Sequence, residues 1–186
     1  MKKIIALLLA LTMALSLAAC GTSGTPETTD APETTDAPAA SLTDTLDVVV
    51  NNIITANPVE FMGGLIPVNL EDTSEDGLWA IKSYTGLENA DQLKEIAVYE
   101  PMMGSIAFSM VLVRVNEGVD TKAVAEGMKA GIDPRKWICV GADEVMAAGY
   151  GDVAMLIMLD STTGLSAQSF VDAFQSVCGA DLDFTI

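Results

Sequence analysis

An acidic run at residues 72–77 is the stretch of this sequence closest to a ligand-binding pattern. Oxygen-bearing side chains stand at alternate positions, Asp72, Ser74 and Asp76, and a glycine follows them, as at the opening of a calcium loop. The twelfth position of a standard loop is a bidentate Glu, whereas here it is Ser83. Two interpretations remain open: a weak calcium site, and an exposed acidic loop or helix cap.

The sequence lacks histidine and the common sequence motifs in which catalytic serine and lysine residues occur. The chain has no histidine, which excludes Ser-His-Asp and Cys-His designs and removes the commonest transition-metal ligand. Ser-x-x-Lys, Gly-x-Ser-x-Gly and Gly-x-x-x-x-Gly-Lys signatures are also missing. Two converging carboxylates remain an alternative, since 22 acidic residues follow Leu42, and they would suit a hydrolase of wall glycan or peptide.

Two thiols lie in the C-terminal half of the chain, Cys139 and Cys178. Outside a membrane such a pair often forms a disulfide, and we expect Cys139 at the start of a strand and Cys178 at the end of a helix. Both also have apolar neighbours, which is typical of buried free thiols. The sequence leaves a disulfide and two free thiols as alternatives.

Four residues form the candidate recognition surface. Met102 and Met103 stand between a proline and a glycine, where a methionine-rich loop can adapt to a partner. Arg135 and Trp137 belong to an Arg-Lys-Trp segment with the only adjacent basic pair beyond the N-terminus. This segment can grip an acidic group of a ligand, or it can form salt bridges and pack.

The N-terminus has the pattern of a targeting signal. A basic start and an apolar run to Leu17 lead into Ala18-Ala19-Cys20, which resembles a bacterial lipobox. We therefore expect a signal peptide at residues 1–19 and acyl chains on Cys20, which would anchor the protein to the outer face of the bacterial cytoplasmic membrane. Residues 20–41, rich in Thr, Pro, Glu and Asp, predict a disordered tether.

Charge limits the choice of partners. The chain has 9 basic and 26 acidic residues, a formal charge of −17. From Leu42 onward the chain has 22 acidic and 7 basic residues, so the predicted domain at residues 42–186 has a formal charge of −15 by itself. Nucleic acid is excluded as a partner, because phosphate binding depends on Lys and Arg.

Apolar periodicity predicts an α+β fold, a mainly antiparallel sheet packed by about three helices in a two-layer sandwich. The expected helices lie near residues 42–54, 121–130 and 166–177. The expected strands lie at residues 65–70, 95–99, 106–115, 137–140, 144–148 and 152–159, and the last two form a hairpin. The strand at 106–115 is apolar on both faces, which predicts a central position.

Together with the lipobox and the linker, the segments at residues 100–103 and 128–137 resemble a family of small lipoproteins from anaerobic Gram-positive bacteria that carry a domain of unknown function. The resemblance covers about residues 91–174. It implies an extracytoplasmic, lipid-anchored domain and no reaction, cofactor or catalytic residue. We predict a non-enzymatic binding or scaffolding module of the cell envelope, whose partner is an envelope protein, peptide or glycan. The hydrolase and a calcium-stabilised binding domain are the alternatives.

Overall fold

The computed structural model describes residues 42–186, so the predicted signal peptide, Cys20 and the linker lie outside the described residues. The helices are α1 (Leu46–Ala56), α2 (Glu75–Thr85), α3 (Thr121–Gly131) and α4 (Ala167–Cys178), with a 3-10 turn at Ser161–Thr163. The strands are β1 (Gly63–Ile66), β2 (Leu93–Pro101), β3 (Phe108–Val115), β4 (Glu144–Tyr150), β5 (Val153–Leu159) and β6 (Phe184–Thr185).

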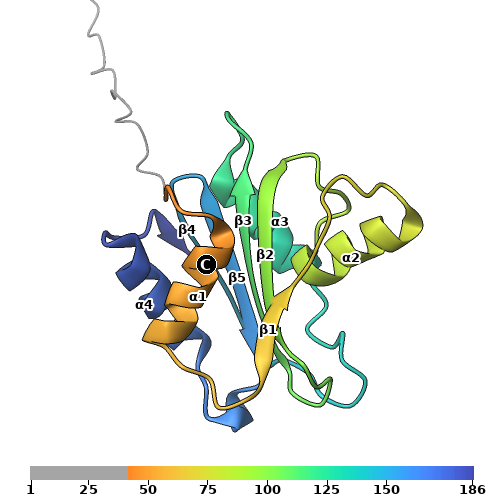
Figure 1. Cartoon of the computed structure of the whole chain (residues 1–186), viewed down its shortest axis with the longest axis vertical. Coiled ribbons are helices and arrows are strands. Elements are labelled where there is room, and N and C mark those ends of the chain that lie inside the picture. Colours follow the sequence, from red (N-terminus) through yellow and green to blue (C-terminus); the bar gives the residue numbers. More distant parts are fainter. Residues whose placement is uncertain (1–41) are drawn as a thin grey trace, which may run out of the picture. The chain divides into compact units, whose positions relative to one another are not determined.

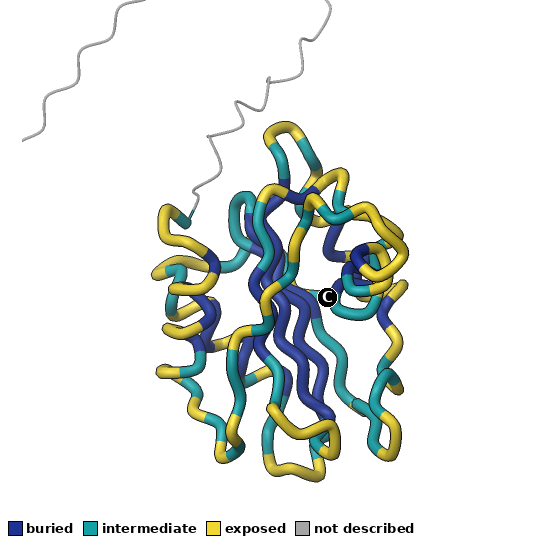
Figure 2. The backbone as a smooth tube through the Cα atoms, turned by 45° about the vertical axis from the view of Figure 1, so that its right-hand side comes forward, coloured by how far each residue is buried: buried dark blue, intermediate teal, exposed yellow. Residues whose placement is uncertain are grey.

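The six strands form one antiparallel sheet in the order β1-β2-β3-β5-β4-β6 (Figure 1). The predicted hairpin is confirmed as β4 and β5, and Gly151 supplies a positive φ of 59° in its turn. β5 also pairs with β3, so these two strands occupy the centre. Every residue of β3 and β5 is buried, and the sheet is the dark centre of Figure 2. The α+β class and the central position of the strand near residues 106–115 are therefore confirmed.

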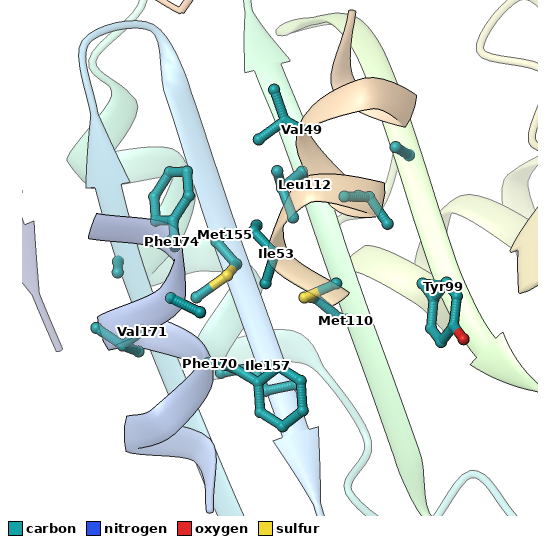
Figure 3. Close-up of a cluster of buried hydrophobic side chains, with 14 of the residues drawn as sticks. Val49, Ile53, Tyr99, Met110, Leu112, Met155, Ile157, Phe170, Val171 and Phe174 are labelled. Carbon is teal, nitrogen blue, oxygen red and sulfur yellow. The ribbon is translucent and has the colours of Figure 1, made fainter. Parts of the chain in front are cut away.

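Helices cover both faces of the sheet, because the central strands are apolar on both faces. On one face α1 and α4 pack against Phe108, Met110, Leu112, Met155 and Ile157, and Figure 3 shows most of this cluster. On the other face Val124, Ala125 and Met128 of α3 pack against alternate residues of the same strands. The prediction of two layers and about three helices is wrong in this respect: four helices and the sheet make three layers.

The sequence misses α2 because this helix is short of apolar side chains. Ile81 is its only buried hydrophobic residue, and Gly77 lies within its first turn. The acidic run before it is nevertheless a cap: Ser74 Oγ accepts a hydrogen bond from the amide of Gly77 at 3.2 Å.

Two further predictions differ from the structure. Residues 137–140 are irregular rather than a strand, and β1 ends at Ile66 instead of continuing to Leu70. Pro67 explains the second difference, since proline lacks the N–H that would extend the ladder.

Carboxylates remote in sequence cap two of the helices. Glu95 Oε1 accepts from the amide of Leu46 at 2.7 Å, and Glu144 Oε2 accepts from the amide of Ala167 at 2.6 Å. α3 is capped locally by Asp120, as predicted. Negative charge is favourable at a helix N-terminus, so part of the acidic excess contributes to the fold itself.

Candidate recognition surface

Lys136 lies at the centre of a polar network that joins four parts of the fold. Its ammonium forms an ion pair with Glu100 of β2 at 2.5 Å and donates to the carbonyl of Ser83 and the hydroxyl of Ser109, at 3.2 and 3.3 Å. It also lies over the ring of Tyr84, 4.8 Å from the centroid. With all three donors of the ammonium used, α2, β2, β3 and the segment after α3 meet at one point.

This ion pair is nearly removed from solvent. The side chains of Lys136 and Glu100 are 11% and 14% exposed. Desolvation lowers the pKa of Lys136, although the charge and hydrogen bond of Glu100 act in the opposite direction. Burial, with a smaller contribution from Glu100, raises the pKa of Tyr84. Breaking such a pair is costly, because it leaves a buried charge without a partner. The pair therefore holds β2 at Glu100 against the segment after α3 at Lys136.

Exposed apolar side chains cluster on the segments that this network joins. Met102 follows Glu100 by two residues and Ile138 follows Lys136 by two, so the Cα atoms in each of these two pairs are at most about 7 Å apart. A third segment lies alongside, because the amide of Met102 donates to the carbonyl of Met62 at 2.9 Å. The four exposed side chains concerned, which we call the apolar rim, are Met62, Met102, Met103 and Ile138.

The apolar rim lies at one end of the sheet. Figure 1 shows the loop after β2 and the segment after α3 beside each other at the lower end of the strands. Ile138 is 98% exposed, so burial in the fold does not explain a large apolar side chain at this position. Exposed apolar patches of this kind commonly mark interaction sites.

The structure brings the four predicted recognition residues into one region but gives them different surroundings. Met102 and Met103 are exposed in the loop after β2. Arg135 is exposed and takes part in none of the ion pairs within residues 42–186. Trp137 is half-buried against the core of the α3 face, with the ammonium of Lys136 5.4 Å from its ring centroid. Of the two alternatives for this segment, the structure shows salt bridging by Lys136 and packing by Trp137, and binding of an acidic group by Arg135 stays a prediction.

Sequence reasoning missed Lys136, Met62 and Ile138. Pairing of Lys136 with a residue 36 positions away depends on the tertiary fold. The exposure of Ile138 was missed because residues 137–140 were predicted to be a strand, whereas the structure leaves them irregular.

The opposite end of the sheet holds the start of the described chain. The guanidinium of Arg114 donates to the carbonyls of Leu42 and Asp44, both at 2.7 Å, and pairs with Glu95 and Asp152 at 3.0 Å. Burial opposes the charge of Arg114, but hydrogen bonds to the two carboxylates raise its pKa. β3 begins beside the loop that carries Met102, and Arg114 is the seventh residue of this eight-residue strand, so about 20 Å separate the start of β3 from Arg114.

Glu95 and Asp152 also bear on the hydrolase alternative, because they are two carboxylates converging on one point. Each accepts hydrogen bonds from Arg114, and the second oxygen of Glu95 caps α1. Both side chains are thus committed to holding the N-terminal segment on the sheet.

The residues of the weak calcium candidate take part in helix capping. Asp72 Oδ1 accepts from the amide of Ser74 at 3.0 Å, and hydrogen bonds from Ser74 lower the pKa of Asp72. Asp76 is exposed in the first turn of α2. Across residues 42–186, no three acidic or cysteine side chains gather as a metal-binding group.

Cys139 and Cys178 are both free thiols. Cys139 is exposed in the irregular segment, so it neither begins a strand nor lies buried as expected. Cys178 ends α4, as predicted, and is partly buried. Burial, with a contribution from the charge of Asp183, raises the pKa of Cys178 to about 12.

The described chain is thus an α+β domain in which four helices cover both faces of an antiparallel sheet. Comparison with family models, with curated proteins and with solved structures finds no significant match to this chain. Among the helices of residues 42–186, none has the length and apolar character needed to cross a bilayer.

Proposed function

We propose that this protein is a lipid-anchored, non-enzymatic binding module of the bacterial cell envelope, attached through Cys20 and presenting the apolar rim to a protein partner. The observation that carries the proposal is that the start of the described chain and the apolar rim lie at opposite ends of the domain. Leu42, where a tether would join, is held at one end of β3, and the apolar rim lies at the other.

The rim has the composition of an adaptable docking surface on a rigid support. Three of its four residues are methionines, whose flexible side chains can repack against different apolar shapes. The backbone beneath them is fixed by the buried pair of Lys136 and Glu100. Side-chain adaptability therefore comes without the cost of ordering a loop on binding.

Charge selects among the partners that such a surface would accept. A domain of formal charge −15 repels a second copy of itself and an anionic membrane surface. It attracts a partner whose apolar contact residues are flanked by Lys or Arg, and exposed Glu60 lies two positions before Met62. A cationic, partly apolar envelope protein or peptide is the partner class that fits.

Anchoring and recognition are tested separately. In expressing bacteria, a clickable palmitate analogue should label the protein, and Cys20→Ser should abolish the label. For recognition, the Cys20→Ser chain is used to capture envelope proteins, and each captured candidate is then purified and titrated directly. Met102→Ser with Met103→Ser should weaken its binding by about tenfold or more, as expected for loss of two apolar contacts.

Val48→Ser is the matched control, since Val48 is an exposed apolar residue on α1. It should bind like the parent chain. Equal affinity of the rim double variant and the parent for every purified partner would refute the rim as the recognition surface. Persistence of the lipid label in Cys20→Ser would refute the anchor.

A further inference from the structure

A cavity lies on the flank of the molecule between α2 and the segment after α3. Its volume is about 280 Å³. From α2 it is lined by Trp79, Lys82 and Ser83, and from the end of α3 and the segment after it by Gly131, Asp133 and Lys136. Residues of one helix three and four apart share a face, so Trp79, Lys82 and Ser83 form one wall.

The two walls are held rigidly against each other. A Cβ at Gly131 would lie 2.2 Å from the carbonyl oxygen of Gly86, so the ends of α2 and α3 touch through backbone alone. Gly86 has a φ of 77°, which favours glycine, and it ends α2. A second link between the two walls is the hydrogen bond that Lys136 donates to the carbonyl of Ser83. The cavity is therefore formed before any ligand arrives.

One of the residues that line this cavity carries an exposed indole ring. Trp79 is 68% exposed, and no part of the fold requires so large an apolar ring in solvent. A tryptophan in this position offers a flat apolar platform with a polar N–H at its edge.

The other residues that line the cavity supply both a hydrogen-bond acceptor and a hydrogen-bond donor. Asp133 Oδ1 accepts from the amide of Arg135 at 2.8 Å, while Oδ2 accepts no hydrogen bond from residues 42–186 and is available to a ligand hydroxyl. Lys82 is a donor, and its ion pair with Glu88 is 55% and 78% exposed, so it can exchange partners at small cost.

The local charges nearly cancel. Lys136 is paired with Glu100 and Lys82 with Glu88, and the charge of Asp133 is offset by exposed Arg135, whose amide donates to Asp133. The site therefore lacks the net positive charge that would attract an anion, and the acidic domain around it repels anions further. A neutral ligand with one apolar face and a hydroxylated edge satisfies both the ring and the polar groups.

We infer that this cavity is a saccharide-binding site, in which one sugar ring stacks on Trp79 and its hydroxyls hydrogen-bond to Asp133 and Lys82. It is separate from the apolar rim, because none of the rim residues lines it. The domain would then hold a neutral glycan on its flank and a protein partner at the end of its sheet.

The test uses the Cys20→Ser chain and two soluble probes, the β-1,4-linked tetramer of N-acetylglucosamine and maltotetraose. Trp79 and Trp137 are the only tryptophans in the chain, so a Trp137→Phe variant reports on Trp79 alone. We expect saturable quenching or enhancement of Trp79 fluorescence by at least one probe, with a Kd of about 1 mM or tighter. The probe that binds shows whether an acetamido group is needed.

Trp79→Ala and Asp133→Asn should each weaken binding by about tenfold in calorimetric titration. Thermal unfolding of Trp79→Ala should match that of the parent, since the ring is mostly exposed. Met102→Ser with Met103→Ser, the rim double variant, should bind sugar normally, which separates this site from the proposed protein-docking function. Absence of saturation with both probes, or equal affinity in Trp79→Ala, would overturn the inference.

Discussion

Removal of the ammonium from the ion pair beneath the apolar rim should destabilise the domain by far more than removal of a surface charge. Lys136→Met keeps the aliphatic stem but leaves the Glu100 carboxylate 14% exposed and without its cation. Breaking one side of a buried pair typically costs about 3–5 kcal/mol. We expect a value near the lower limit, about 3 kcal/mol, because Glu100 keeps some access to water.

Urea unfolding followed by circular dichroism measures this cost as a shift in midpoint at constant slope. The chain provides a matched control in Lys82→Met, since Lys82 and Glu88 also pair closely, at 2.7 Å, but with side chains 55% and 78% exposed. Exposed pairs contribute about 0–1 kcal/mol, so Lys82→Met should be nearly neutral.

The double variant Lys136→Met with Glu100→Leu tests the reason for the cost. If an uncompensated buried charge causes the loss, removal of both charges should recover about 2 kcal/mol or more of it. Equal effects of Lys136→Met and Lys82→Met, or a double variant as unstable as the sum of its singles, would refute the reasoning.

Three further predictions concern the rest of the domain. Arg114→Met should cost about 3 kcal/mol in urea unfolding, because it releases two backbone carbonyls and leaves two carboxylates unpaired, and a value below about 1 kcal/mol would contradict this. Hydrogen bonds from the 3-10 turn hold the pKa of Asp143 below its usual 3.8. The ionised carboxylate therefore contributes its full stabilisation above pH 3.8, and this contribution is lost as the pH falls through the pKa of Asp143 in the folded protein. Asp143→Asn should be less stable than the parent at pH 6, and the two should be equally stable below the pKa of Asp143 in the folded protein. An equal difference at both pH values would exclude the carboxylate as the cause. In the Cys20→Ser chain, Ellman's reagent at pH 8 should react quickly with exposed Cys139 and much more slowly with Cys178, because partial burial raises the pKa of Cys178 to about 12. Cys139→Ser should remove the fast phase, and a fast phase that survives would disprove the assignment.

Local patterns predicted the elements that dominate the core. The unbroken apolar runs of β3 and β5 indicated central strands, and the glycines between β4 and β5 indicated their hairpin. α3 was predicted with its cap, since Asp120 immediately precedes the helix that it caps. In each case the residues that decide the structure are close in sequence, where propensity and periodicity act.

Elements held by distant contacts were predicted poorly. α2 has one buried hydrophobic residue, so its position depends on glycine contacts with the end of α3 rather than on an apolar face. The start of α1 was placed too early, because its capping group is Glu95, 49 residues away, instead of a nearby hydroxyl. The segment from Trp137 to Val140 was taken for a strand on composition, although it has no neighbour to pair with.

Within residues 42–186, the sequence by itself determined the fold class, the acidic character and two of the segments that carry the proposed recognition residues. These properties follow from composition and from contacts between near neighbours. Only the tertiary structure decided that Lys136 is largely buried and paired while Arg135 beside it forms no ion pair, that Met62 lies beside Met102, and that these two residues lie at the end of the sheet opposite Leu42. The physical reason is that burial and charge pairing depend on which segments meet across the sheet, and the residues that meet at Lys136 come from positions 83, 84, 100 and 109.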